Sequence, residues 1–226
     1  MDWSALRLSA YLSLATALIL IPLSIAVGRW LATSSHRFKP LVEAALALPL
    51  VLPPTVLGYY LLVSMGGASP LGSLYQEWTG HTLAFSFSGL LLASLIFNIP
   101  FAMMPIQRAF EAIPQELFDA ARTCGLSRWR TLWHIELPLA WRGILSGLIM
   151  TAAHTLGEFG VVLMVGGSIP GETQTIAISI YDKVQSFDLH PAGVMSAMLL
   201  FISMATLLVT TWLSRSRGVG SVRQRK

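Results

Sequence analysis

The chain has 226 residues, of which 54% are hydrophobic and 12% are charged, with a mean hydropathy of +0.65 and a formal net charge of +4. The charged fraction is about half that of a soluble globular domain, which argues against a soluble protein and for a membrane protein. One cysteine excludes an intramolecular disulfide, and the five histidines are scattered without metal-ligand spacing.

Five apolar runs are long enough to cross a bilayer, each near the ~20 residues that span a ~30 Å hydrocarbon core. They cover residues 8–31, 41–65, 82–105, 143–165 and 192–213. Because lipid offers the backbone no hydrogen-bond partners, each run is predicted to be helical. The sequence therefore predicts an all-α polytopic membrane protein, with one membrane domain over residues 1–214 and a basic tail over residues 215–226.

The basic residues favour one side of the membrane. Thirteen of the 15 Lys and Arg follow the first span, lie between the third and fourth, or follow the fifth, and the exceptions are Arg7 and Lys183. The positive-inside rule then places the amino terminus outside the membrane and the carboxy terminus inside. The charge thus reflects topology, with no nucleic-acid partner, and the tail is expected to contact anionic lipid. The first run reads as a retained helix rather than a cleaved signal, because it is long and its basic residues follow it.

Prolines interrupt the second span, with Pro53 and Pro54 at the centre and Thr55 beside them. Broken helices at membrane depth occur where protein or a watery cavity re-satisfies the freed backbone groups. We expect Pro53, Pro54 and Thr55 to line a translocation path. The alternative is a kinked helix that only packs.

The polar segment 109–141 separates the third and fourth spans. Pro114 and Gly125 suit the start and the position just past the end of a helix over residues 114–124, with Glu116 in its first turn. Ser127 can cap a second short helix, which Pro138 is expected to end. The first helix presents a narrow face of small residues to a partner, formed by Leu117, Ala120, Ala121 and Cys124. The alternative is an amphipathic helix that lies on lipid headgroups.

Span four carries a polar stripe of Thr151, His154, Thr155 and Glu158, near one face of a helix that also carries Gly143 and Gly147. Ionisable groups in membranes usually face a bundle interior or a water-filled path, so the four polar residues are candidates for the path. The alternative is a packing seam in which the hydroxyls bond to the backbone. Glu158 is a poor anion ligand and is expected to orient a neighbouring helix or anchor a gate.

Two further features bear on function. The chain has no Gly-Lys pair and therefore no P-loop, so ATP would be hydrolysed on another polypeptide. The outer segment 166–175 is rich in Gly, Ser and Thr, which can bind an oxyanion but more often form a surface loop. An integral membrane enzyme that uses His154 and Glu158 as acid and base is a distant alternative, because no nucleophile or cofactor motif accompanies them.

A motif in segment 109–141 resembles the coupling loop of bacterial ABC-importer permeases. The family pattern is Glu-Ala-Ala, three residues, Gly, nine residues and Ile-x-Leu-Pro, and the matching positions here are Asp119, Ala120, Ala121, Gly125, Ile135, Leu137 and Pro138. Only Asp119 departs, with the same charge on a shorter stem. Residues 50–60, 156–160 and 166–175 look like permease subunits of molybdate importers and their sulfate-importing relatives.

The resemblance implies the type I ABC importer transmembrane domain in a bacterial cytoplasmic (inner) membrane. It further implies a homodimer of this chain, two cytoplasmic ATPase subunits that use ATP with Mg, and an extracytoplasmic molybdate-binding protein. It also implies import of molybdate and tungstate by alternating access, with no cofactor or metal bound by this chain. A sulfate or thiosulfate permease of the same superfamily is the close alternative.

Overall fold

The computed structural model describes residues 2–215, and these form helices and loops with no strand, as predicted. In chain order the elements are α1 (Trp3–Thr33), α2 (Lys39–Val51), α3 (Pro54–Met65), α4 (Pro70–Thr79), α5 (Phe87–Glu111), α6 (Gln115–Thr123), α7 (Arg128–Thr131), the π-helical turn η1 (Leu132–Glu136), α8 (Leu137–Gly157), α9 (Gly160–Gly166), α10 (Ile176–Gln185) and α11 (Leu189–Arg215). All but the first residue of the predicted basic tail lies outside the described residues.

The helices account for three to five membrane spans in the described chain. α1, α5 and α11 are each long and apolar enough to cross a bilayer. Two bent helix pairs bring the total to five if each pair is one span: α2 with α3, bent by 107°, and α7–α8 with α9, bent by 61°. On that count, the five predicted runs correspond to three uninterrupted helices and two broken ones.

The predicted boundaries of the third span are wrong at both ends. α5 begins at Phe87, because the Ser86 side chain accepts a hydrogen bond from the Gly89 amide and caps the helix there. It continues past Pro105 to Glu111, although both Pro100 and Pro105 lie inside it. The helices α4 and α10 were not predicted, because each is short and lies outside the long apolar runs.

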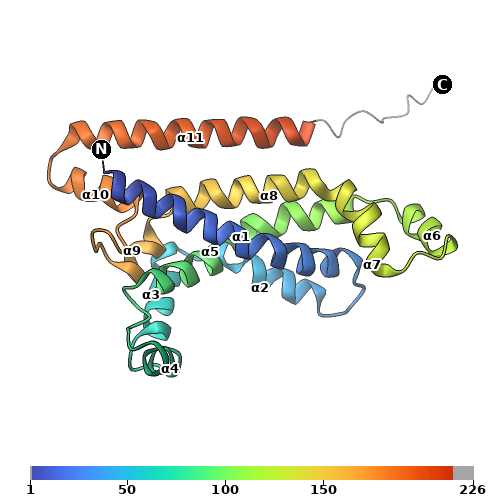
Figure 1. Ribbon diagram of the computed structural model, residues 1–226, viewed down its shortest axis with the longest axis horizontal. Helices are drawn as coiled ribbons and strands as arrows, with labels where there is room; N and C mark the ends of the chain where they lie inside the picture. The colour runs from blue at the N-terminus through green and yellow to red at the C-terminus, as the bar shows by residue number, and fades with distance from the viewer. Residues whose placement is uncertain (1, 216–226) are drawn as a thin grey trace.

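Helices α1, α5 and α8 lie side by side and form the centre of the molecule (Figure 1). One end of this bundle carries α6 and α7, the end of α1 and the end of α11. The opposite end carries the amino terminus, α9 and α10, while α3 and α4 project away from the bundle axis. The loops that were predicted to share one side of the membrane therefore meet at one end of the molecule.

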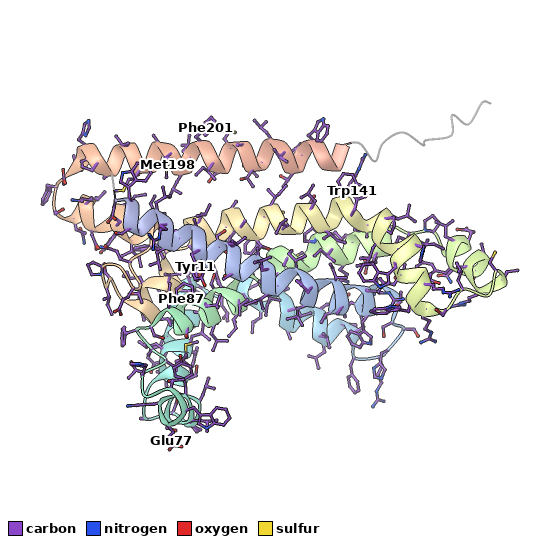
Figure 2. All side chains as sticks on the ribbon, viewed as in Figure 1. Tyr11, Glu77, Phe87, Trp141, Met198 and Phe201 are labelled. Carbon is purple, nitrogen blue, oxygen red and sulfur yellow. The ribbon has the colours of Figure 1, made fainter. Side chains whose placement is uncertain are left out.

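α11 is the least enclosed of the long helices, with 11% of its apolar window buried within this chain. Figure 2 shows Met198 on the side of α11 that faces the bundle and Phe201 on the opposite side. Phe201 is 74% exposed, as expected for a surface that lipid or a second subunit covers.

Candidate functional site

α6 lies at the end of the molecule as a separate short helix, close to the predicted range (Figure 1). It runs over Gln115–Thr123, with Pro114 as the capping residue before it and Glu116 in its first turn. Asp119 is exposed and its carboxylate lies 3.6 Å from the Arg122 guanidinium. The acidic residue of the motif is therefore accessible to a partner.

A tight turn joins α6 to α7, as the glycine in the motif predicts. Gly125 has φ +73°, a conformation that L side chains rarely adopt, and the Leu126 amide donates to the Ala121 carbonyl at 2.9 Å. The Ser127 hydroxyl then accepts from the Arg130 amide at 3.3 Å and caps α7. The predicted positions of Gly125 just past the end of α6 and of Ser127 as the cap of the next helix are confirmed.

The predicted docking face of α6 needs one correction. Leu117, Ala120 and Cys124 are exposed on the described chain, whereas Ala121 is buried with only 3% of its surface exposed. Phe118 is half-buried and packs against the apolar cluster at this end of the bundle. Ala121 therefore lies on the inner face of α6, because a short helix at the surface must bury one stripe to stay folded.

Pro138 does not end a helix, contrary to the prediction. α7, η1 and α8 follow one another without a break, and Pro138 lies in the first turn of α8. The Leu137 amide donates to the Leu132 carbonyl, five residues back. This wider turn relieves the clash between a proline ring and the preceding turn, so the helix continues through the motif. Ile135 is half-buried in the same turn.

The second span is broken at the predicted prolines. Leu52 and Pro53 are extended, with ψ of 136° and 134°, and α3 starts at Pro54. Pro53, Pro54 and Thr55 are all exposed on this chain. The break is complete, because two separate helices meet there at 107° rather than one kinked helix.

A second break, not predicted, lies in span four. α8 ends at Gly157, and Glu158 is its extended cap with ψ of 126°. Glu158 is therefore outside the helix on which the polar stripe was drawn. The two breaks touch, because a Cβ added at Gly160 would lie 2.8 Å from the Pro54 Cβ. Pro53, Pro54, Thr55 and Glu158 thus lie at two neighbouring backbone interruptions, whereas Thr151, His154 and Thr155 lie inside α8.

A buried polar cluster joins the second break to α5 and α1. One oxygen of Glu158 accepts from the Ser94 hydroxyl and from Asn98 Nδ2, both at 3.2 Å. Ser94 also accepts from the Thr16 hydroxyl of α1 at 3.3 Å. Asn98 Oδ1 lies 3.0 Å from His154 Nδ1, which must be the donor because an amide oxygen only accepts. These contacts agree with the expectation that Glu158 orients a neighbouring helix.

The glycines of span four form a packing seam. A Cβ at Gly143 would lie 2.8 Å from the Pro105 carbonyl oxygen, and one at Gly147 would lie 3.0 Å from the Ala102 carbonyl oxygen. Thr155 donates to the Thr151 carbonyl at 2.8 Å, and both threonines are buried. In this chain the stripe therefore faces α5, as the seam alternative predicts.

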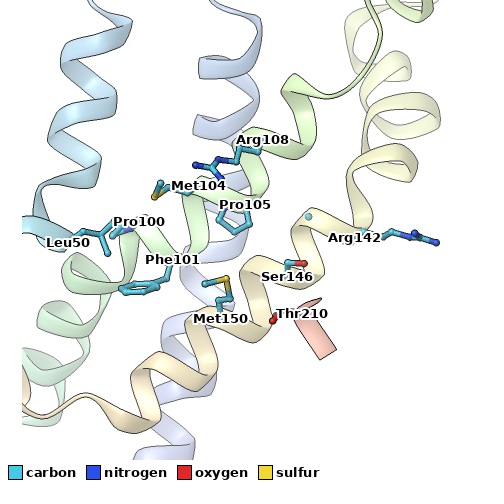
Figure 3. Close-up of a pocket in the computed structure, with 11 residues that line it drawn as sticks. Leu50, Pro100, Phe101, Met104, Pro105, Arg108, Arg142, Ser146, Met150 and Thr210 are labelled. Atoms are coloured by element: carbon cyan, nitrogen blue, oxygen red, sulfur yellow. The ribbon is translucent and has the colours of Figure 1, made fainter. Parts of the chain in front are cut away.

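A cavity of about 470 Å³ opens beside this seam, between α2, α5, α8 and α11. None of the seven residues proposed for the path lines it; His154 reaches its edge by stacking on Phe101, with ring centroids 3.7 Å apart. Figure 3 shows Phe101 and Met150 on its apolar walls and Arg142 projecting away from it. The cavity is mainly apolar with one end marked by Arg108.

Segment 166–175 is held by hydrogen bonds to α10. Ser168 donates to the Asp182 carboxylate at 2.7 Å, and Gln174 Nε2 donates to the same oxygen at 2.8 Å. A carboxylate at this position opposes an oxyanion by charge. The surface-loop alternative is therefore the better description of Ser168 in this chain.

An all-helical membrane subunit with two broken spans and a separate helix at one end is the architecture of an importer permease. The chain belongs to the family of binding-protein-dependent transport system inner membrane components, whose family model matches residues 21–217. It is a multi-pass inner-membrane permease, and the prediction of a transport subunit rather than an enzyme is confirmed.

Similar proteins share most of the length of the chain. It is 41% identical to the molybdenum transport system permease protein ModB of Azotobacter vinelandii, over 91% of each chain. It is 38% identical to the ModB protein of Escherichia coli K12, over 95% of this chain and 94% of that one. A sulfate transport system permease protein, CysW of Synechocystis, is 30% identical over 95% of this chain and 78% of its own.

A solved structure supports the fold. The chain superimposes on a bacterial alginate ABC transporter, solved with an alginate pentasaccharide-bound periplasmic protein, with a TM-score of 0.70 at 16% identity. The match covers 93% of this chain and 76% of that chain. The predicted ABC importer fold is therefore confirmed, and at this identity the likeness carries the fold alone.

Among the described residues, no three His, Cys, Asp or Glu side chains are arranged to hold a metal ion. His154 and Glu158, the acid and base of the alternative enzyme, both bond to Asn98 in the interior. Both side chains therefore make polar contacts that join α8 and the residue after it to α5.

Proposed function

We propose that the chain is the pore-forming subunit of an ATP-driven importer of molybdate and tungstate. The observation that carries this proposal is the greater similarity to molybdenum permeases, at 41% and 38% identity, than to the sulfate permease, at 30%. Tungstate is included because it is a tetrahedral dianion like molybdate.

The working assembly would contain two copies of this chain, two ATPase subunits that use ATP with Mg, and an extracytoplasmic molybdate-binding protein. The family supports the use of a binding protein. The exposed apolar surface of α11 supports a partner subunit or lipid. In this proposal residues 1–214 form the membrane domain, and the tail over 215–226 contacts anionic lipid.

The ATPase would dock on α6 and the turn after it. Support comes from the exposure of Glu116, Asp119 and Ala120 and from the conformation of Gly125. Ala121 would hold α6 against the bundle. Ile135, Leu137 and Pro138 would connect the docking segment to α8. Closure of the ATPases would move α6. The path would then open to one side of the membrane or the other, because ligands bind the two conformations with different affinities.

The amino terminus would lie outside and the carboxy terminus inside. The basic loops of the described chain gather at the end that carries α6, which supports this orientation. Three exposed tryptophans of α7, η1 and the start of α8 lie at the same end, namely Trp129, Trp133 and Trp141, as is typical of a membrane–water interface.

The path would pass the two adjacent helix breaks. Pro53, Pro54 and Thr55 are exposed on a single chain and are free to face a second subunit. His154 and Glu158 would fix the second break in place through their contacts with Asn98. Thr151 and Thr155 lie on the same helix as His154. This assignment rests on the contact between Pro54 and Gly160.

Uptake of labelled molybdate into right-side-out vesicles tests the proposal. The cognate ATPase and the cognate binding protein are both present. Excess tungstate is expected to compete and sulfate is not. ATP-dependent uptake that sulfate or thiosulfate abolishes, while tungstate has no effect, would favour the sulfate permease instead. Absence of ATP-dependent uptake of any of these anions would refute the proposal.

A further inference from the structure

The inner end of α1 is joined to the α7–η1–α8 helix by an ion pair in which the Glu136 carboxylate is buried and the Arg29 side chain is 30% exposed. Glu136 in η1 has no exposed surface, and its carboxylate accepts from Arg29 Nε at 2.5 Å and from Arg29 Nη2 at 2.7 Å. The Arg29 guanidinium therefore donates hydrogen bonds to both carboxylate oxygens of Glu136. Such a two-point contact fixes orientation as well as distance, which a sliding apolar contact does not.

The position of Glu136 connects this ion pair to the predicted docking helix. The turn from α6 to α7 is held by the Leu126 amide on the Ala121 carbonyl and by the Ser127 cap. From Ser127 the chain is helical through η1 and α8. A displacement of α6 therefore reaches Glu136 through hydrogen-bonded backbone.

Packing between α6 and α1 is loose by comparison. A cavity of about 240 Å³ lies between the end of α1 and the α6–α7 turn, and it is lined by Arg29 and Glu136 as well as by Thr33, Phe118 and Arg122. A second cavity, of about 430 Å³, shares the last three of these residues. Phe118 packs on the apolar cluster but also borders both cavities, so its apolar contact is only partial, whereas the ion pair joins α1 to η1 directly.

The opposite end of α1 is hydrogen-bonded to the outer elements. The Ser9 hydroxyl accepts from the Ile176 amide, the first residue of α10, at 2.8 Å, and Ser9 is fully buried. Ser179 of α10 donates to Asp2, the cap of α1, at 3.1 Å. α1 is thus a continuous helix with a polar attachment at each end.

Stability alone does not explain the inner attachment. Burying the Glu136 carboxylate costs its hydration, and well-packed apolar residues often replace a buried ion pair without loss of stability. The pair also lies at a π-helical turn, a local irregularity that is frequent at functional sites.

We infer that the Arg29–Glu136 ion pair is a positioning contact that carries displacement of the α6 segment to α1, and that α1 relays it to α10 at the outer end. Arg29 and Glu136 touch no substrate and act through α1. The inference rests on the proposed function, because it assigns the route by which a loaded binding protein outside and an ATPase inside sense each other.

The experiment uses the full complex with its ATPase and binding protein in liposomes, and measures ATP hydrolysis with and without molybdate-loaded binding protein. Glu136→Gln keeps the volume of the side chain and removes the charge. We expect basal hydrolysis of the assembled complex to stay near wild type, while stimulation by the binding protein falls at least about fivefold, the lower end of usual coupling effects. Lys39→Gln, which removes an exposed ion pair between α2 and α5, is the matched control and is expected to keep stimulation.

Two further variants test the inference even if the Glu136→Gln complex fails to assemble. The charge-reversed pair Arg29→Glu with Glu136→Arg is expected to recover stimulation, and an assembled double variant without recovery contradicts the inference. Ser9→Ala removes one buried hydroxyl at the far end of α1 and is expected to lower stimulation as well.

Normal stimulation in either Glu136→Gln or Ser9→Ala would overturn the relay. If the wild-type complex itself imported no molybdate, the proposed function would fail instead, whatever the variants did. The two failures are therefore distinguishable.

Discussion

Replacing Gly143 with alanine is expected to destabilise the chain, because α8 approaches α5 most closely there. The added Cβ would overlap the Ala109 Cβ and lie 2.8 Å from the Pro105 carbonyl oxygen. Neither atom is at the end of a flexible side chain. The two helices must therefore separate, or α8 must shift along α5.

The magnitude follows from two opposing effects. Alanine in place of glycine favours a helix by about 1 kcal/mol. Inserting a methyl group into a packed interior costs about 1 to 3 kcal/mol, and the upper part of that range applies where backbone atoms are met. The net loss is therefore about 1 to 2 kcal/mol, which corresponds to a melting temperature lower by roughly 2 to 8 °C for a chain of this size.

Thermal unfolding in detergent, followed by the fluorescence of the seven tryptophans, measures this loss. Gly157→Ala is the matched control, because Gly157 ends the same helix and a Cβ there meets nothing within 4 Å. The control is expected to melt at or slightly above the wild-type temperature.

A Gly143→Ala chain that melts with or above the wild type would refute the packing-seam reasoning. That result would mean that Gly143 borders open space in the assembled protein, as the path alternative for this stripe requires. The same measurement therefore separates the two interpretations of span four.

Three further outcomes are expected. Gly125→Val should lower ATP-dependent uptake far more than Gly125→Asn, because asparagine tolerates the left-handed conformation at φ +73° and valine does not; equal uptake would contradict a conformational role. Asn98→Leu should lower thermal stability by about 1 to 3 kcal/mol, because it leaves the buried Glu158 carboxylate with fewer donors; unchanged melting would show that this cluster is not stabilising. The hydrogen bond from the Ala5 amide lowers the pKa of Asp2, so the stability from this cap is present above the usual carboxyl pKa and lost as pH falls through the lowered value. Asp2→Asn, an equally good cap, should melt like wild type at pH 7 and lose less stability on acidification, and an identical acid transition would argue against the contribution of Asp2.

Much of the architecture could be predicted from local sequence signals. Long apolar runs give the number of spans because lipid forces them to be helical, and proline pairs such as Pro53-Pro54 interrupt a helix in any context. The ends of α6 were predictable for the same reason, since Gly125 and Ser127 act on their own backbone neighbours.

The predictions were wrong where contacts between residues far apart in the sequence determine the local structure. The spacing of the stripe in span four is compatible with one helix through Glu158, but Ser94 and Asn98 hold that carboxylate beyond the helix end. Periodicity also could not reveal the π-helical turn before Pro138, because its wider winding leaves no residue pattern. Ala121 was misassigned because small residues suit either a docking face or a buried one.

The position of the single cysteine has a practical consequence. Cys124 is exposed directly after α6, on the same face as Leu117 and Ala120. Any protein that covers this face also shields the thiol, so the rate at which a maleimide alkylates the unaltered chain reports occupancy of the surface. The molecule thus carries a native chemical reporter where its engagement with a partner is expected to change.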